Sequence, residues 1–311
     1  MVTQTYSADR PLRIGSRGSP LAIAQAIEAR DRLMAAHGLP ETAFMVEAIT
    51  TTGDAVQDRP LSEIGGKGLF TKELETALFD RRIDIAVHSM KDVATVLPGG
   101  LALIAYLPRE DVRDAFISLE YAGFDDLPEG AVIGTSSLRR RAQALTRRPD
   151  VHVVDFRGNV QTRLRKLEAG VAAATFLACA GLKRLNASLA APIPTDVMLP
   201  AVAQGAIGIE ARTDDEAVAA LIAPLNDPET EIRLTAERAF LRALDGSCRT
   251  PLAGLAELEN GRLNLRGEIL RPDGSRRHAA ARSGSTADAE AMGLDAAAEL
   301  RALGGSRFFD F

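Results

Sequence analysis

The chain has 311 residues, more than one hydrophobic core comfortably supports, so we expect two or three domains. A hydrophobic content of 46% and a charged content of 25% are typical of an ordinary globular protein. The net charge of -5, the aromatic content of 5% and the absence of Trp disfavour nucleic-acid binding, which uses basic surfaces and stacking platforms.

The sequence shows no signal for export or for insertion into a membrane. Residues 1–6 lack the basic and apolar regions of a signal peptide, and the longest apolar run, 171–182, is too short to cross a bilayer. Two cysteines, Cys179 and Cys248, cannot build a disulfide framework. We therefore expect a cytoplasmic protein in a reducing compartment.

The first third of the chain alternates strands and helices. A short buried strand is expected at 12–15, and Ser19 with Pro20 then begins a helix that runs to about residue 37. The following expected elements are a strand at 44–49, a glycine-rich loop at 58–68, a helix at 70–81 and a strand at 83–87. This β-α-β order predicts a parallel sheet, with ligands beyond the carboxyl ends of its strands.

A second α/β unit is expected from about residue 108. Its predicted elements are strands at 131–134, 151–156 and 172–177, with helices from 138, at 160–168 and up to 185. Residues 192–200 are proline-rich and are expected to link two domains, and a strand at 206–211 is expected to return to the first domain.

The last part of the chain has a different pattern. A helix at about 229–244 precedes strands around two hairpin signals, Asn260-Gly261 and Pro272-Asp273-Gly274, and an alanine-rich helix covers about 287–303. This predicts a small α+β domain. The expected division is domain 1 at 1–107 with 202–225, domain 2 at 108–201 and domain 3 at 226–311.

Three predicted strand-to-helix junctions combine arginine with glycine or hydroxyl residues. They are Gly15-Ser16-Arg17-Gly18-Ser19, Gly134-Thr135-Ser136-Ser137-Leu138-Arg139-Arg140 and Arg157-Gly158-Asn159. Each could present backbone N–H groups and a guanidinium to an anion, although helix caps use the same residues for structural reasons alone. Nine basic residues fall between 139 and 166, so a small polyanion is the ligand that this region suggests.

The sequence His88-Ser89-Met90-Lys91-Asp92 places a cation and a carboxylate at the end of another strand. A solvated turn with a local Lys91–Asp92 pair explains it as well as a binding site does. The four histidines show no ligand spacing and no cysteine pair supports zinc, so we expect no metal and a structural role for His88.

Cys248 lies in the polar segment Asp245-Gly246-Ser247-Cys248-Arg249 rather than among apolar residues. The neighbouring Arg249 favours the thiolate, which is the form that makes covalent bonds. An incidental surface cysteine is the alternative on local sequence alone.

Six motifs occur together in the order found in one enzyme family. They are Gly65-Gly66-Lys67-Gly68-Leu69-Phe70, His88-Ser89-Met90-Lys91-Asp92, Gly134-Thr135-Ser136-Ser137-Leu138-Arg139-Arg140, Arg157-Gly158-Asn159-Val160, Ala180-Gly181-Leu182-Lys183-Arg184-Leu185 and Gly246-Ser247-Cys248. In these motifs, from about residue 12 to 254, the chain resembles the porphobilinogen deaminases, also called hydroxymethylbilane synthases.

The resemblance implies a transferase of porphyrin and heme biosynthesis with two periplasmic-binding-protein-like (type II) α/β domains and a C-terminal α+β domain. It implies head-to-tail condensation of four porphobilinogen molecules into the linear tetrapyrrole hydroxymethylbilane, with release of ammonia. A dipyrromethane cofactor would be attached to Cys248 through a thioether, and the many pyrrole carboxylates would need a sector of arginines.

Residue by residue, the resemblance implies a catalytic role for Asp92, whose carboxylate would stabilise positive charge on a reacting pyrrole. Besides Cys248, the implied cofactor-binding residues are Lys91, Ser137, Arg139, Arg140, Arg163 and Arg184. The implied substrate-binding residues are Arg17, Ser19, Lys67, Thr135, Ser136, Arg157 and Gln204. Glu63 stands where a relative often has lysine, which weakens the case for a second loop cation.

A non-catalytic anion-binding receptor on the same two-domain scaffold is the main alternative. It explains the three anion-binding junctions but gives no reason for Cys248 or Asp92. The expected partners of the enzyme are porphobilinogen alone, with no nucleic acid, membrane or metal, and the expected state is a monomer.

Overall fold

The computed structural model describes residues 6–55, 68–187, 191–245, 250–305 and 308. These residues form two compact units. Among the described residues, unit 1 contains residues 6–55, 68–110 and 205–231, and unit 2 contains residues 111–187, 191–204, 232–245, 250–305 and 308. The division into three domains stays a prediction.

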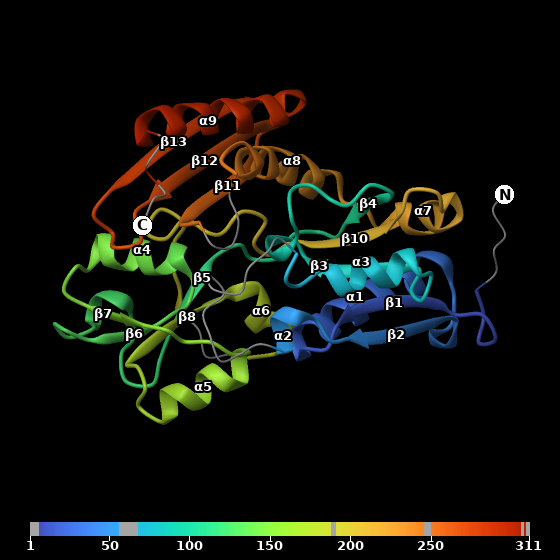
Figure 1. Ribbon diagram of the computed structural model, residues 1–311, viewed down its shortest axis with the longest axis horizontal. Coiled ribbons are helices and arrows are strands. Elements are labelled where there is room, and N and C mark those ends of the chain that lie inside the picture. The colour runs from blue at the N-terminus through green and yellow to red at the C-terminus, as the bar shows by residue number, and fades with distance from the viewer. Residues whose placement is uncertain (1–5, 56–67, 188–190, 246–249, 306–307, 309–311) are drawn as a thin grey trace. The chain divides into compact units, whose positions relative to one another are not determined.

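Unit 1 is built on a five-stranded sheet with the strand order β2-β1-β3-β10-β4 (Figure 1). Its strands are β1 (Leu12–Arg17), β2 (Phe44–Ile49), β3 (Ile85–Ser89), β4 (Leu101–Tyr106) and β10 (Ile207–Arg212). β1 pairs in parallel with β2 and β3, whereas β10 is antiparallel to both β3 and β4. The sheet is therefore mixed rather than wholly parallel as the β-α-β order predicted. The reason is that β10 comes from the predicted returning segment, which enters the sheet in the opposite direction.

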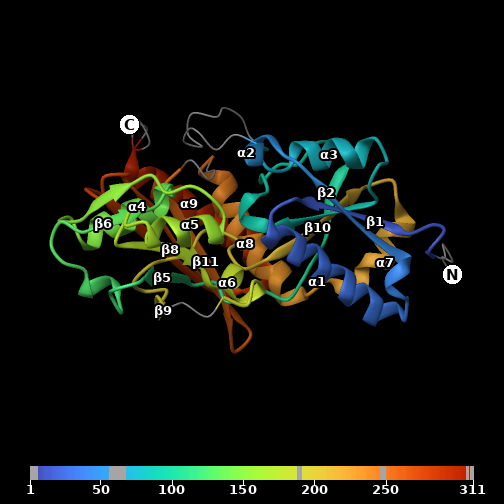
Figure 2. The same cartoon turned by 90° about the horizontal axis from the view of Figure 1, so that it is seen from below.

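Helices cover both faces of this sheet. The helical segments are α1 (Pro20–His37), η1 (Glu41–Ala43), α2 (Thr52–Ala55), α3 (Lys72–Phe79), η2 (Met90–Asp92), α7 (Glu216–Ile222) and η4 (Ala223–Leu225). Figure 2 shows α1 and α3 on opposite sides of the strands. Helix α1 begins as expected: the Ser19 side chain accepts a hydrogen bond from the Ala22 N–H, and Pro20 is the first helical residue.

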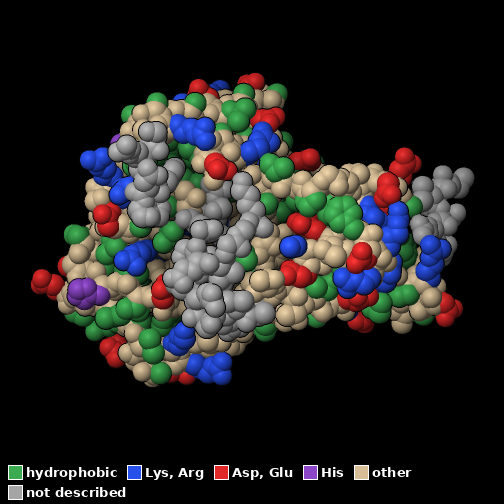
Figure 3. All heavy atoms as spheres, in the orientation of Figure 1, with side chains coloured by type: hydrophobic (Ala, Val, Ile, Leu, Met, Phe, Trp, Pro, Cys, Tyr) green, Lys and Arg blue, Asp and Glu red, His purple; other side chains and the backbone are tan. Residues whose placement is uncertain are grey.

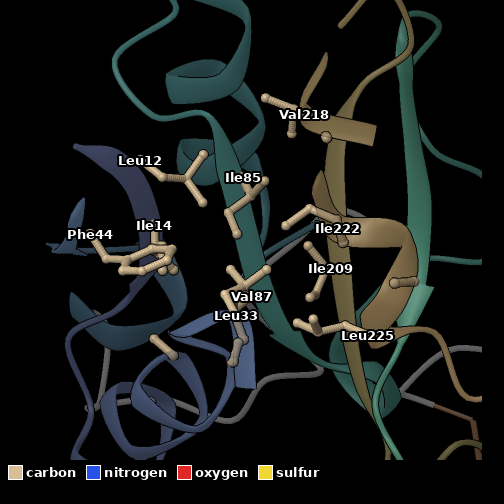
Figure 4. Close-up of a cluster of buried hydrophobic side chains, with 14 of the residues drawn as sticks. Leu12, Ile14, Leu33, Phe44, Ile85, Val87, Ile209, Val218, Ile222 and Leu225 are labelled. Carbon is tan, nitrogen blue, oxygen red and sulfur yellow. The ribbon is translucent and has the colours of Figure 1, made fainter. Parts of the chain in front are cut away.

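The apolar core of unit 1 lies between the sheet and α1, α7 and η4. Figure 4 shows Ile14, Ile85 and Ile209 from three neighbouring strands together with Leu33 of α1 and Ile222 of α7. All five side chains are buried. Burying a side chain of this size contributes about 1.5–3 kcal/mol, so this core fixes the strands whose ends carry the predicted site residues.

Unit 2 contains a second five-stranded sheet, with the order β7-β6-β8-β5-β9. Its elements are β5 (Asp114–Ser118), η3 (Phe124–Asp126), β6 (Val132–Gly134), α4 (Leu138–Arg147), β7 (His152–Val154), α5 (Val160–Glu168), β8 (Ala174–Ala178), α6 (Cys179–Arg184) and β9 (Ala191–Pro192). β6 is parallel to β7 and β8, and β5 is antiparallel to β8. In the first sheet β1 lies between β2 and β3, and the antiparallel β10 comes next to β3. In the second sheet β6 lies between β7 and β8 in the same way, and the antiparallel β5 comes next to β8. This repetition is the periplasmic-binding-protein-like arrangement expected from the sequence.

The third sheet, also in unit 2, is an antiparallel meander with the order β11-β12-β13. Its elements are α8 (Pro228–Ala243, whose first residues belong to unit 1), β11 (Leu252–Glu259), β12 (Arg262–Leu270), β13 (Arg277–Ser285), η5 (Thr286–Asp288) and α9 (Ala289–Gly304). Asn260 and Gly261 both have positive φ, at 51° and 75°, as a tight hairpin turn requires. The predicted α/β plus α+β fold class is confirmed.

Helices α8 and α9 approach each other closely at Gly293. A Cβ atom on Gly293 would lie 2.3 Å from the carbonyl oxygen of Ala236. Phe240 of α8 packs on the other side against Gly254 of β11 and Gly267 of β12. This packing fixes α8, the helix that precedes the predicted cofactor segment.

Candidate functional site

In unit 1, Arg17 lies between two carboxylates and an aromatic ring. It is the last residue of β1, and its guanidinium binds both oxygens of Asp54, with Nη2–Oδ1 at 2.5 Å and Nε–Oδ2 at 3.1 Å. Its Nη1 lies 3.4 Å from Oδ2 of Asp92, and its Cζ is 4.1 Å from the centre of the Phe70 ring. The structure thus brings together two predicted site residues, Arg17 and Asp92.

The protonation of this cluster is set by opposing effects. Burial lowers the pKa of Arg17, but the hydrogen bond with Asp54 and the charge of Asp92 outweigh it and raise the pKa overall. For Asp54, burial raises the pKa of the carboxyl, but the hydrogen bonds and charge of Arg17 together with the hydrogen bonds of Thr51 outweigh burial and lower the pKa overall. Arg17 is therefore a permanent cation and Asp54 an anion at neutral pH.

Two further predicted residues of unit 1 stand at strand ends. Ser19 caps α1, and Lys91 belongs to the single turn η2 together with Asp92. His88 lies on β3 and forms a buried pair with Glu210, with Nε2 and Oε2 2.8 Å apart. His88 therefore has the structural partner that the sequence led us to expect.

In unit 2, the predicted residues Arg139, Arg140 and Gln204 converge on Asp114. Arg139 Nη1 is 2.7 Å from Asp114 Oδ2, and Arg140 Nη2 and Nε are 2.6 and 3.1 Å from Asp114 Oδ1. The Nε2 atom of Gln204 donates to the same Oδ1 at 3.0 Å. All four side chains are buried. Arg139 and Arg140 lie in the first turn of α4, whose N-cap is Ser137.

Asp114 is held as an anion by these arginines. Complete burial raises the pKa of its carboxyl, but the charges and hydrogen bonds of Arg139 and Arg140 prevail and hold the pKa well below its usual range. Arg139 and Arg140 also donate to the carbonyl oxygens of Leu199 and Phe176 respectively, at 2.8 and 2.9 Å. One carboxylate faces two guanidinium groups, so the cluster carries a net positive charge.

Arg163, in α5, adds positive charge without a matching carboxylate. Its Nε donates to the carbonyl oxygen of Gly158 at 2.9 Å, and within the described residues no Asp or Glu lies within ion-pair distance of it. Burial, followed by repulsion from Arg140 and Arg157, lowers the pKa of Arg163 to about 10. A guanidinium ion without a described carboxylate partner, such as that of Arg163, favours binding of a carboxylate-bearing anion.

The remaining predicted residues of unit 2 lie at or next to the ends of its strands and helices. Ser136 accepts a hydrogen bond from the Phe156 N–H at 2.9 Å, and Thr135 accepts one from the Ser137 N–H at 3.2 Å. Arg157 precedes Gly158, whose φ of 121° suits glycine and brings the chain into α5. Arg184 is the last residue of α6.

Two predicted residues, Cys248 and Lys67, lie outside the described residues. Cys179 is buried, as expected of a core cysteine.

In the described part of the chain, no group of three or more His, Cys, Asp or Glu side chains could hold a metal ion. The helices among the described residues include none with the length and apolarity to span a bilayer. On the face shown in Figure 3, basic and acidic side chains are interspersed.

Sequence reasoning missed Asp54 and Asp114, the carboxylates that hold the predicted arginines. Asp54 pairs with a residue 37 positions away and Asp114 with one 26 positions away. No local signal marks them, because an acidic residue at a turn or at the start of a strand is ordinary. Their signal is the number of arginines at strand-to-helix junctions, since cations that become buried on folding need counter-charges.

The chain matches known proteins along nearly its whole length. Residues 12–220 match the family model described as porphobilinogen deaminase, dipyromethane cofactor binding domain, and residues 231–302 match that of the porphobilinogen deaminase C-terminal domain. A porphobilinogen deaminase of Paracoccus denitrificans is 62% identical over 312 residues, covering 100% of both chains. One of Nitrobacter hamburgensis is 55% identical over 298 residues, covering 95% of this chain and 94% of the relative.

Likenesses to solved structures are weaker. The VFT2 domain of Bordetella pertussis BvgS has a TM-score of 0.39 at 13% identity, covering 68% of this chain and 83% of that domain. A Salmonella typhimurium periplasmic binding protein with high arginine specificity has a TM-score of 0.38 at 13% identity, covering 71% of this chain and 94% of that protein.

These findings define an enzyme with a covalently anchored pyrrole cofactor, and do not favour the anion-binding receptor. The chain belongs to the porphobilinogen deaminase family. The predicted family, enzyme class and dipyrromethane cofactor are confirmed. Condensation of four porphobilinogen molecules head to tail, with release of ammonia, is its reaction.

The described residues fit the cofactor. Dipyrromethane carries several carboxylates, and the guanidinium of Arg163, close to Arg140 and Arg157, is a cation that no described carboxylate neutralises. When bound, the cofactor supplies the pyrrole to which the growing chain is attached. The protein's contribution is then to bind carboxylates and to hold charge at fixed positions.

Proposed function

We propose that Asp92 is the catalytic carboxylate of this deaminase. It follows β3 in the turn η2, about one quarter of its side chain is exposed, and it faces the guanidinium of Arg17. The pyrrole nitrogen of the substrate becomes cationic as ammonia leaves and a new carbon–carbon bond forms. A carboxylate held in place accepts the pyrrole N–H and stabilises that charge without having to reorganise.

Arg17 has two roles in this proposal. Its guanidinium binds a substrate carboxylate, and its contact with Asp54 keeps it from collapsing onto Asp92. The two hydrogen bonds from Arg17 to Asp54, at 2.5 and 3.1 Å, are shorter than the single contact with Asp92 at 3.4 Å, which supports this division of contacts. Ser19, Lys91 and Lys67 are proposed to assist in binding substrate or cofactor carboxylates.

In unit 2, the proposed cofactor-binding residues include Arg163, which has no described carboxylate partner. The lowered pKa of Arg163 carries this assignment, because burial and two cationic neighbours both disfavour its charged form. An anion with several carboxylates removes that cost. The full proposed set comprises Ser137, Arg139, Arg140, Arg163 and Arg184 for the cofactor, with Thr135, Ser136, Arg157 and Gln204 for substrate. Cys248 is proposed as the thioether anchor.

The experiment mixes the purified protein with porphobilinogen and follows the formation of linear tetrapyrrole. We expect Asp92→Ala to lower kcat by about 10²–10³, the usual effect of removing one fixed electrostatic group. We expect Cys248→Ser to lack the cofactor mass in intact-mass spectrometry. Near-normal turnover by Asp92→Ala, or a normal cofactor mass on Cys248→Ser, contradicts the assignment. Arg165→Met, an exposed change in α5, serves as the control.

We further propose that the protein acts in the cytoplasm as a monomer, without a metal ion, and that its product serves heme biosynthesis. The acidic net charge of -5 and the two cysteines support this setting. Size-exclusion chromatography with light scattering, and activity after treatment with a chelator, test the monomer and the independence of metal.

A further inference from the structure

A strained backbone in unit 2 is held by a buried carboxylate. Ala203 has a φ of 60°, in the left-handed region that residues other than glycine rarely adopt. Its N–H donates to Oε2 of Glu237 in α8 at 2.6 Å. The other oxygen of Glu237, Oε1, accepts the N–H of Ala256 in β11 at 2.7 Å. Both Ala203 and Glu237 are buried, so water cannot replace these contacts.

The conformation of Ala203 decides where the next side chain points. Gln204 is buried, and its Nε2 donates to the carbonyl oxygen of Val112 at 2.8 Å and to Asp114 Oδ1 at 3.0 Å. An extended backbone at Ala203 would turn the Gln204 side chain away from these acceptors. The left-handed conformation is therefore needed for the contact between Gln204 and Asp114.

Asp114 passes this restraint to the arginine pair. The same Oδ1 that accepts from Gln204 also accepts from Arg140, and Oδ2 contacts Arg139. Glu237, Ala203, Gln204 and Asp114 thus form one continuous set of contacts, all within unit 2. At one end it holds the proposed cofactor-binding arginines. At the other end lies α8, whose residue Ala243 precedes the segment of Cys248.

We propose that Glu237 is a positioning residue for attachment of the cofactor. It holds Ala203 in the left-handed conformation, and through Gln204 and Asp114 it fixes Arg139 and Arg140 where they bind the cofactor's carboxylates. This inference rests on the assignment of the two arginines proposed above. Strained backbone held by surrounding contacts is typical of functional sites, because the strain keeps a side chain in its working position.

The test uses the full-length protein and the ratio of cofactor-loaded to unloaded chains, read by intact-mass spectrometry. We expect Glu237→Gln to lower this ratio about tenfold, the lower end of the effect of removing an outer hydrogen-bond partner from a ligand site. Glycine adopts a φ near 60° without a Cβ clash, so we expect Glu237→Gln/Ala203→Gly to recover the ratio to within about twofold of the wild type. A purely structural role for Glu237 predicts a lower melting temperature with no change in the ratio, and no rescue.

Two controls separate the alternatives. Glu257→Gln removes another carboxylate of unit 2, whose ion pair with Arg266 is partly exposed, and we expect it to load normally. Arg140→Gln tests the underlying assignment, because it leaves Asp114 paired with Arg139. If Arg140→Gln loads normally, the arginine assignment fails. If Arg140→Gln loses loading and a folded Glu237→Gln does not, the positioning role of Glu237 fails.

A measurement on the wild-type protein avoids any dependence on the folding of a variant. The Ala203 amide is expected to exchange with solvent as slowly as the amides of β12, because its hydrogen bond ends on a buried carboxylate. Exchange as fast as that of an exposed turn shows that Glu237 does not hold Ala203, and this result overturns the proposal.

Discussion

Arg163 offers the sharpest test of the proposed cofactor site, because its charge is unfavourable in the protein without cofactor. One pKa unit corresponds to about 1.4 kcal/mol. A guanidinium whose pKa falls from its usual value to about 10 therefore carries roughly 3 kcal/mol of unfavourable free energy in its charged form. Since the folded-state pKa lies below the unfolded one, this cost is fully present at neutral pH and disappears only in strong alkali.

The perturbation is Arg163→Met, which keeps an unbranched apolar side chain and removes the charge. It also removes the hydrogen bond to the Gly158 carbonyl oxygen, worth about 1 kcal/mol. We therefore expect the free energy of unfolding to rise by about 2 kcal/mol in a cofactor-free background supplied by Cys248→Ser. In the chain that retains Cys248, we expect the same change to lower cofactor loading by at least tenfold.

The assay is urea denaturation at pH 7 for stability and intact-mass spectrometry for loading. Arg165→Met, an exposed change in the same helix, should alter the free energy of unfolding by less than about 0.5 kcal/mol. A loss of stability on Arg163→Met in the cofactor-free background would refute the charge argument. Normal loading would refute the role of Arg163 in binding the cofactor.

Two more predictions concern the carboxylates that hold the arginines. Asp114→Asn leaves two buried guanidinium groups without their shared anion and should lower the free energy of unfolding by about 3–5 kcal/mol at pH 7. Because the folded-state pKa of Asp114 is depressed, its contribution to the free energy of unfolding is present above ~4, the unfolded pKa, and is lost as the pH falls through the lower folded value. Urea titrations should therefore show that the difference in free energy of unfolding between the wild type and Asp114→Asn narrows in acid. An equal difference at pH 7 and pH 2 contradicts this. Asp54→Asn should let Arg17 turn toward Asp92 and neutralise it, lowering kcat about tenfold, while the half-buried pair contributes less than about 1 kcal/mol to stability. Steady-state kinetics with unchanged kcat would show that Asp54 does not keep Arg17 and Asp92 apart.

Much of the fold could be predicted because its signals are local. Ser19 and Pro20 mark the start of α1, and Asn260-Gly261 marks the hairpin between β11 and β12. The return of β10 to the first sheet was also expected and is confirmed by its pairing with β3. These signals depend on residues within a few positions of one another, which a sequence displays directly.

What was missed depends on contacts between distant residues. β4, β5 and α7 were not predicted. β4 and β5 are short apolar segments, and α7 has only seven residues, although Asp215 caps its start. For the candidate site, the arginines could be named from the family motifs, but their partners Asp54 and Asp114 could not. A carboxylate's role as a counter-ion appears only when the chain has folded and the cation has been withdrawn from water.

The position of β10 has a consequence for how the protein is made. β3 and β4 do not pair with each other among the described residues, because β10 lies between them, and β10 begins only at Ile207. While the ribosome synthesises the residues between Tyr106 and Ile207, the nascent sheet has a gap with two unpaired edges. Such edges favour mispairing with other chains. A truncated polypeptide that ends before β10 should therefore aggregate rather than persist as an independent subdomain.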